Sequence, residues 1–231
     1  MASYNLIKNR VTIAGKNEVI RQSLYDYQLY PTAGLTSASF FQVPVGQGQS
    51  TQNGAVVGQP KTLGDTDIRS AGTLPAGNMF RIESIEVPFF AGSTSTASLW
   101  VPQIMTAFNA VAAATVGKAS DDVNVFYSGG HLQLFILSKP YLDEAPLGRF
   151  PPKTHTEVRT AMATNSATTS EVINTFAYQS GRPYIMKPEI TLTPTMNFQV
   201  TIDWLAAIAT PSGFNARFGV VLDGLLERSA Q

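Results

Sequence analysis

Residues 198–204, Phe-Gln-Val-Thr-Ile-Asp-Trp, alternate strictly between apolar and polar side chains. Alternation with a period of two places each kind of side chain on its own face of a β-strand. The stretch therefore predicts a strand with one face on a core and one face toward solvent. Residues 217–222 alternate in the same way, and we expect Phe218, Val220 and Leu222 to point inward.

A second run, at 79–90, alternates on both sides of a break at Ser84. A phase slip inside one run indicates a β-bulge. Asp223-Gly224 predicts a tight turn after the strand at 217–222. Runs of β-branched and aromatic residues predict further strands at 39–45, 123–127, 131–138 and 184–193, with 123–127 and 131–138 forming a hairpin about Gly129-Gly130.

Two segments favour helices. Residues 98–116 are rich in alanine, and Pro102 fits the first turn, where a missing N–H costs nothing. Residues 18–30 have an amphipathic pattern and end before Pro31.

Three segments predict loops. Residues 46–77 are dominated by Gly, Gln, Ser, Thr and Asn. A loop of that length is uncommon in a compact domain, so the segment is either a functional excursion or a pair of poorly patterned strands. Residues 140–152 are proline-rich, and residues 154–170 are polar without periodicity.

These elements predict an all-β fold with one or two helices. Strands do not alternate regularly with helices, so a parallel sheet is disfavoured. About eight strands in 231 residues fit a single jelly roll, a two-sheet antiparallel β-sandwich with long loops. We expect residues 1–34 to form an N-terminal arm and residues 35–231 to form the jelly-roll domain.

The composition excludes several classes of protein. Lys and Arg number 16, Asp and Glu number 16, charged residues make up 14% of the chain, and cysteine is absent. A disulfide scaffold and a cysteine-based zinc site need thiols. Steering of the whole protein onto nucleic acid needs a net positive field. A folded chain with so little surface charge is suited to contact with other protein.

Catalytic patterns are missing from the sequence. It has two histidines, no Gly-x-Ser-x-Gly motif and no phosphate-binding glycine loop. A cupin-type metal site needs more histidines than His131 and His155. Asp65-Thr66-Asp67 and Asp121-Asp122 offer oxygens to Ca²⁺, but such pairs are more often solvated loop carboxylates. We therefore expect no enzyme activity, no cofactor and no metal.

The segment 87–117 carries no charge. Within it, residues 97–117 are apolar enough to raise the question of a membrane span. Polar residues inside the stretch and its alanine-rich character favour a helix buried in the protein or in an interface. The N-terminus has no apolar stretch of signal-peptide length, so secretion is unsupported.

Four basic residues near the N-terminus form a candidate nucleic-acid-facing arm: Lys8, Arg10, Lys16 and Arg21. Tyr4, Tyr25 and Tyr27 are interleaved with them and would stack on bases. The competing interpretation is a solvated arm without a ligand.

Two parts of the chain carry a resemblance. Residues 25–31 with 40–48, and residues 197–202 with 217–224 and Arg228, resemble structural proteins of bacterial viruses of the jelly-roll capsid type. The resemblance covers roughly a third of the chain. It implies a capsid building block that assembles into a shell through trimers or pseudo-hexamers. Phages with an internal membrane often use two jelly rolls in one chain, whereas this chain has the length of one.

The resemblance implies a non-enzymatic capsid protein of a bacteriophage, assembled in the host bacterial cytoplasm into an icosahedral virion. Its partners would be copies of itself, other virion proteins and the packaged genome through the arm. Nothing in the sequence supports contact with an internal membrane. We expect the subunit interface to include Trp100, Met105, Phe108, Tyr141 and Phe150.

Two other classes compete with this interpretation. One is a minor capsid protein, a spike or a carbohydrate-binding jelly roll, with Trp100, Tyr127, Tyr141 and Tyr184 as an exposed aromatic platform. The other is an enzyme on a β-sandwich, for which the sequence lacks a catalytic constellation.

Overall fold

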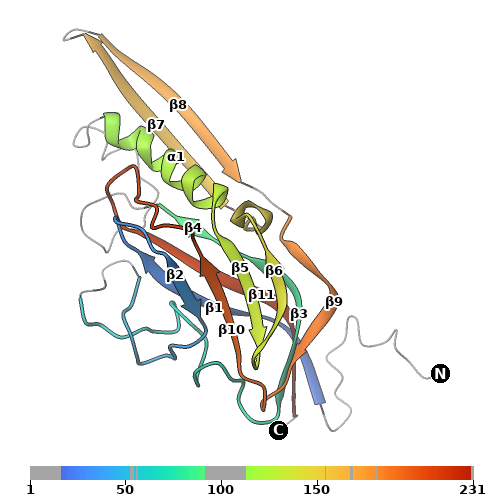
Figure 1. The fold of residues 1–231 in the computed structure, drawn as a ribbon. Coiled ribbons are helices and arrows are strands. Elements are labelled where there is room, and N and C mark those ends of the chain that lie inside the picture. The colour runs from blue at the N-terminus through green and yellow to red at the C-terminus, as the bar shows by residue number, and fades with distance from the viewer. Residues whose placement is uncertain are drawn as a thin grey trace.

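The computed structural model describes residues 17–52, 55, 57–91, 113–153, 155–166, 169–179 and 182–229. Figure 1 shows two layers of strands with a helix and a long hairpin at one end. One sheet has the order β1-β11-β3-β9, with the short β4 also paired to β11. Its strands are β1 (Asn17–Tyr30), β3 (Asn78–Glu86), β4 (Phe89–Phe90), β9 (Tyr184–Leu192) and β11 (Ala216–Ser229).

The second sheet has the order β2-β10-β5-β6. Its strands are β2 (Ser37–Phe40), β5 (His131–Ile136), β6 (Lys139–Glu144) and β10 (Phe198–Asp203). Every pairing in both sheets is antiparallel.

The eight strands β1, β2, β3, β5, β6, β9, β10 and β11 pair in a nested order. The first pairs with the last, β2 with β10, β3 with β9, and β5 with β6. This is the order of a folded ribbon of strand pairs rolled into two four-stranded sheets, which is the jelly roll. The predicted fold class is therefore confirmed.

The core lies between the sheets, and the alternating stretches at 198–204 and 217–222 line it. Val200 and Ile202 of β10 are fully buried, and so are the inward residues of the 217–222 stretch, Phe218, Val220 and Leu222. Aromatic rings fill one end of the core. Tyr30 makes edge contacts with the rings of Phe89, Phe126, Trp204 and Phe218 at centroid distances of 5.6–5.9 Å. Each buried ring of this kind stabilises the fold by roughly 1.5–3 kcal/mol.

The predicted irregularity at Ser84 is confirmed. The register of β3 shifts between Ile82 and Ser84 against β9, and that of β11 shifts between Asp223 and Gly224 against β3. The expected turn at Asp223-Gly224 is wrong, because both residues lie inside the continuous strand β11. Gly224 is needed for close approach: a Cβ there would lie 1.8 Å from the carbonyl oxygen of Arg81.

The helix expected over residues 18–30 is wrong, because this segment is β1. It pairs with β11 along 14 residues, from Asn17 to Tyr30. Val19, Leu24 and Tyr27 are spaced for a helix, but β-branched and aromatic residues also favour strands, and the partner strand decides the outcome. Residues 17–30 of the expected arm are thus part of the sheet.

The strand expected at 123–127 is also wrong. These residues belong to α1 (Ala113–Ser128), where Val123 and Phe126 are buried at helical spacing. The helix expected at 98–116 lies mostly outside the described residues. The hairpin in this region is β5–β6, which turns at Leu137-Ser138, so the loop expected from residue 140 begins as a strand.

The polar segment expected to be a loop at 154–170 forms most of a hairpin instead. β7 (His155–Ser166) pairs with β8 (Thr169–Gln179). The hairpin follows the 3₁₀ turn η2 (Leu147–Arg149) and extends past the sandwich, with α1 beside β7 (Figure 1). Within the described part of residues 41–77 only isolated β-bridges occur, at Thr66 and between Ser70 and Thr73, so this segment is a long excursion.

Candidate functional site

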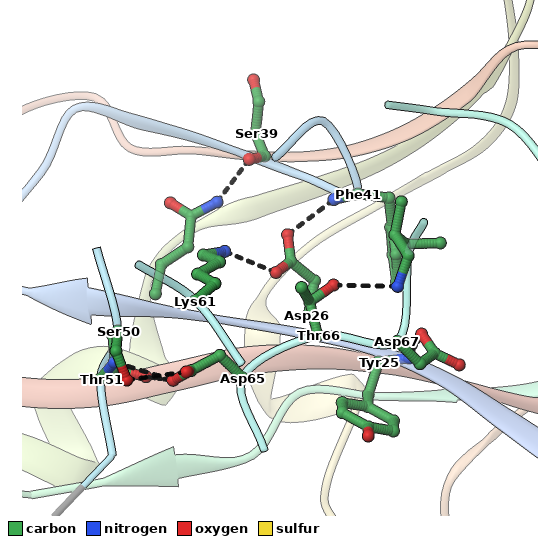
Figure 2. Close-up of polar contacts among 12 residues, drawn as sticks. Tyr25, Asp26, Ser39, Phe41, Ser50, Thr51, Lys61, Asp65, Thr66 and Asp67 are labelled. Carbon is green, nitrogen blue, oxygen red and sulfur yellow. Dashed lines mark hydrogen bonds and ion pairs between the residues drawn. The ribbon is translucent and has the colours of Figure 1, made fainter. Parts of the chain in front are cut away.

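The excursion at 41–77 is fastened to β1 by a buried ion pair. Asp26 is fully buried on β1, and Lys61, which is 4% exposed, places its Nζ 2.6 Å from Asp26 Oδ1. The other carboxylate oxygen of Asp26 accepts the backbone N–H of Phe41 at 2.7 Å (Figure 2). Burial raises the pKa of Asp26, although the Lys61 ammonium opposes the shift. One side chain thus holds both the start and the middle of the excursion.

A second carboxylate, Asp65, organises the excursion from within. Its oxygens accept hydrogen bonds from the Ser50 hydroxyl at 2.8 Å, the Thr51 backbone and hydroxyl at 2.7 and 2.8 Å, and the Thr62 backbone at 3.0 Å. Burial alone would raise the pKa of Asp65, but these donors outweigh it and hold the pKa below its usual value. We call Asp26, Lys61 and Asp65 the loop anchor.

Arg217 of β11 holds the excursion from the outer face of the sheet. Its Nε donates to the Thr51 hydroxyl at 3.0 Å and its Nη2 to the Gly64 carbonyl at 2.7 Å. The guanidinium lies 3.9 Å from the centroid of the Tyr27 ring. That ring lies over Gly219, where a Cβ would be 2.3 Å from its Cδ1. The absence of a side chain at Gly219 therefore leaves the room that the Tyr27 ring needs to stack with Arg217.

The charged groups of the loop anchor are committed to partners inside the chain, so their chemistry is that of a structural fastening. Asp65 and Asp122, expected to be solvated, are both buried, which corrects that expectation. Asp122 of α1 accepts the backbone and hydroxyl of Ser212 at 2.9 and 2.5 Å. Among the described residues, no three His, Asp or Glu side chains are grouped to hold a metal ion.

A groove of about 750 Å³ runs beside the loop anchor along the edge of β1. We call it the edge groove. Gln22–Tyr25 form one wall, residues 67–78 contribute the other, and its apolar lining includes Leu24, Ile68, Leu74 and Leu226. At its end, Asp67 Oδ1 accepts the backbone N–H of Tyr25 at 3.0 Å, whereas Oδ2 is buried without a hydrogen bond. Burial raises the pKa of Asp67 to about 6.

The predicted nucleic-acid arm is only partly described. Lys8, Arg10 and Lys16 lie outside the described residues. Arg21 lies on β1 with an exposed side chain, and its Nη1 is 3.1 Å from Glu83 Oε2. Arg21 therefore forms an ion pair with a carboxylate on the same sheet.

The predicted interface residues fall into three groups. Trp100, Met105 and Phe108 lie outside the described residues. Tyr141 on β6 is 54% exposed and open to a partner. Phe150 is fully buried, with its ring centroid 4.9 Å from that of Tyr184, so its assignment to an interface is wrong.

Of the residues of the alternative aromatic platform, Trp100 lies outside the described residues and Tyr141 is exposed on β6. The Tyr127 hydroxyl donates to the Val87 carbonyl at 2.7 Å, and the Tyr184 hydroxyl donates to Glu144 at 3.1 Å, so both phenols are bonded within the chain.

The sequence interpretation missed the loop anchor. Asp26 falls at an inward position of β1, between the buried residues Leu24 and Tyr30. An acidic residue at such a position signals a buried ion pair, but only after the segment is recognised as a strand. Lys61 and Arg217 carry no local signal, because their partners are distant in the chain.

The described helices include none with the length and apolar character needed to span a membrane. Compared with known proteins, the chain matches no protein-family model, no curated protein and no solved structure.

Proposed function

We propose that this chain is a structural subunit of a bacterial virus capsid, which assembles with copies of itself into the shell and catalyses no reaction. The observation that carries the proposal is the nested eight-strand jelly roll in a chain with 14% charged residues. Viral capsid proteins, lectins and cupins share this architecture, so the fold alone does not choose among them.

The filling of the sandwich disfavours a cupin-like enzyme. In the described residues, the space between the sheets is occupied by Tyr30, Phe89, Phe126 and Phe218 rather than by a set of polar ligands. A closed apolar interior supplies a rigid wall, which is what a shell subunit requires.

The distribution of charge supports self-association. Several charged side chains are neutralised within the chain: Asp26 by Lys61, Glu18 by Arg228, and Asp223 by Lys153. Internal pairing leaves a surface on which like-charge repulsion between copies is small. Contacts between such surfaces are expected to depend little on salt.

The end of the sandwich that carries α1 and the β7–β8 hairpin is our candidate for the contact with a neighbouring subunit. A two-stranded ribbon is only marginally stable alone, so packing against a neighbour would stabilise it. Leu205 lies in the connection between β10 and β11, and Ser212 of the same connection is hydrogen-bonded to Asp122 of α1. Leu205 is fully exposed, so it adds an apolar side chain to this end. In trimers or hexamers within a shell, this end of each copy would contact the neighbouring copy.

The test is the assembly state of the purified chain. We expect large oligomers or shells in negative-stain microscopy and sedimentation velocity over a range of salt concentrations. A stable monomer at high protein concentration in every salt condition would rule the proposal out. Binding of a discrete trimer to a glycan array would support the spike or carbohydrate-binding alternative instead.

A pair of variants tests the contact surface separately. Leu205→Asp should reduce assembly, because it adds a charge to the proposed apolar contact. Thr195→Asp places the same charge on an exposed residue in the β9–β10 connection, at the opposite end of β10, and should leave assembly unchanged. Equal assembly by both variants would exclude this end as the interface.

A further inference from the structure

Two long strand edges are left open among the described residues, one on β1 and one on β8. The other edges are protected: β2 and β4 have only four and two residues, β6 and β9 contain Pro140 and Pro188, and β7 has α1 beside it. Short length and proline both limit further pairing at an edge. In contrast, β1 has 14 residues, β8 has 11, and neither contains proline.

The open part of β1 is its first half. The excursion covers the second half, where Tyr25 donates its N–H to Asp67 Oδ1 at 3.0 Å and accepts the Asp67 N–H at 3.3 Å. Further along, Tyr27 donates its N–H to the Asp65 carbonyl at 2.8 Å. No described segment pairs with the edge from Val19 to Ser23.

The covered half shows which backbone groups of the open half point outward. Tyr25 and Tyr27 bond to the excursion, and backbone direction alternates along a strand. Val19, Arg21 and Ser23 therefore present their N–H and C=O groups at the open edge, whereas the residues between them face β11. A strand added here would form its hydrogen bonds with these three residues.

The open edge of β8 belongs to a ribbon that has no third strand. β7 and β8 form a two-stranded sheet of their own, and α1 lies beside β7, so β8 is the free side of the ribbon (Figure 1). A two-stranded ribbon is marginally stable, and a third strand would stabilise it. At about 3.3 Å per residue, β8 spans about 36 Å, which exceeds the roughly 17 Å from Val19 to Ser23.

The two open edges cannot meet within one molecule. Figure 1 shows the start of β1 beside the C-terminus, at the end of the sandwich opposite the β7–β8 hairpin. Every copy carries one edge of each kind, so a head-to-tail contact satisfies both edges in every copy, and such contacts close into a ring when the rotation between copies allows it. Glu171 is the only charged residue of β8, so the contact sets no like charge against Arg21.

We propose that the free edge of β8 in one copy pairs with Val19–Ser23 of β1 in the next copy and so extends the first sheet across the subunit boundary. The inference rests on the proposed function, because it names the surfaces through which this chain self-associates. Backbone hydrogen bonds supply the contact, as they do when a peptide adds a strand to a sheet edge. The added strand would also lie along the edge groove, which Gln22, Ser23 and Leu24 line from β1.

A proline on the open edge tests the contribution of β1. Arg21→Pro removes an outward N–H and leaves the N–H groups that face β11 in place, a position at which edge strands tolerate proline. The loss of one hydrogen bond should raise the protein concentration needed for assembly about tenfold, measured by sedimentation velocity. Arg21→Ala is the matched control, because it removes the same side chain but keeps the N–H, and it should assemble like the unmodified chain.

Engineered cysteines test the partner strand, because the chain has no cysteine of its own. Chains with Gln22→Cys are mixed, before assembly, with chains that carry one cysteine at each of residues 171–177 in turn. Paired strands bring opposite side chains within about 4.5–5.5 Å, which suits a disulfide. Disulfides between the two populations should form at every second position of β8, because alternate side chains share a face. Thr195→Cys, at an exposed site outside the strands, is the control and should form none.

Hydrogen exchange adds a measurement on the unmodified chain. The N–H groups of Val19 and Ser23 should exchange slowly in the oligomer and fast in the monomer at low concentration. Equally slow exchange in both states would show that this edge is already paired within one molecule, which overturns the proposal.

The remaining outcomes separate this proposal from the proposed function. If the unmodified chain assembles, three results would overturn the edge contact alone: normal assembly of Arg21→Pro, disulfides without a period of two, or Gln22→Cys chains that link only to each other. The last result would show that two β1 edges pair instead. If the unmodified chain does not assemble at all, the proposed function fails and the edge contact fails with it.

Discussion

Asp26 and Lys61, 35 residues apart in the chain, form an ion pair of 2.6 Å in which neither side chain is more than 4% exposed. The pair joins a strand of the first sheet to an excursion without regular strands. Removing one partner of a buried pair leaves the other charge without compensation and destabilises the fold. Replacing both partners with uncharged groups can leave the stability nearly unchanged.

Lys61→Met should therefore destabilise the protein by about 3–5 kcal/mol. The double variant Asp26→Asn/Lys61→Met should recover most of that loss, because the Asn oxygen still accepts the Phe41 N–H and no charge remains. Urea denaturation of the single and double variants measures both effects. Equal loss in the two variants would contradict the attribution to an uncompensated charge.

The stability of the protein should depend on pH through Asp67. Its pKa is about 6 in the folded protein and 3.8 in the reference state, so the folded state binds more protons between these values. The cost of ionising Asp67 is thus fully present above pH 6 and disappears as the pH falls toward 4. Asp67→Asn should stabilise the protein by about 3 kcal/mol at pH 7.5. At pH 4 the two proteins should unfold alike, and a constant difference across the range would contradict the assignment.

Gly224→Ala should destabilise the protein by more than about 3 kcal/mol, a size reserved for severe backbone or packing conflict. The added methyl group would lie 1.8 Å from the Arg81 carbonyl oxygen, which is backbone and cannot move alone. Gly129→Ala is the matched control, because its nearest neighbour is the flexible end of Ile208 at 3.3 Å. Thermal unfolding compares them, and similar melting temperatures would refute the steric argument.

Arg217→Lys should loosen the excursion while leaving the sandwich intact. Lysine keeps the charge but loses the two-pronged contact with Thr51 and Gly64 and the stacking on Tyr27. We expect faster proteolytic cleavage within residues 41–77 and a global loss of about 1 kcal/mol. Arg182→Lys, at an exposed position before β9, serves as the control. Unchanged cleavage would mean that Arg217 does not hold the excursion.

The parts of the fold predicted from the sequence are those in which burial alternates along one strand. In residues 198–204 and 217–222 the alternation is visible within the strand itself. The break at Ser84 marks the bulge because the phase of burial changes there. Residues 18–30 do not reveal a strand locally, because their apolar spacing suits a helix as well as a strand. The partner that decides between them, β11, lies about 200 residues away.

The remaining errors have related causes. The β7–β8 hairpin has no apolar alternation regular enough to predict it, and Val123 to Tyr127 have strand propensity inside a helix. The loop anchor depends on Asp26 meeting Lys61 and Asp65, and neither encounter is encoded in local spacing. The burial of Phe150 is not predictable either, because composition does not determine whether a single aromatic residue is exposed.

The nested pairing of the strands determines when the first sheet can be completed during synthesis of the chain. β11 lies between β1 and β3, and it is the last of the described strands to be synthesised. Until it emerges, β1 and β3 each lack a neighbour on that side, and the pairs between β1 and β11 span about 200 residues. Contacts of such long range fold slowly. A chain cut short during translation would therefore display two unsatisfied strand edges, so quality-control proteases could tell it from the complete fold.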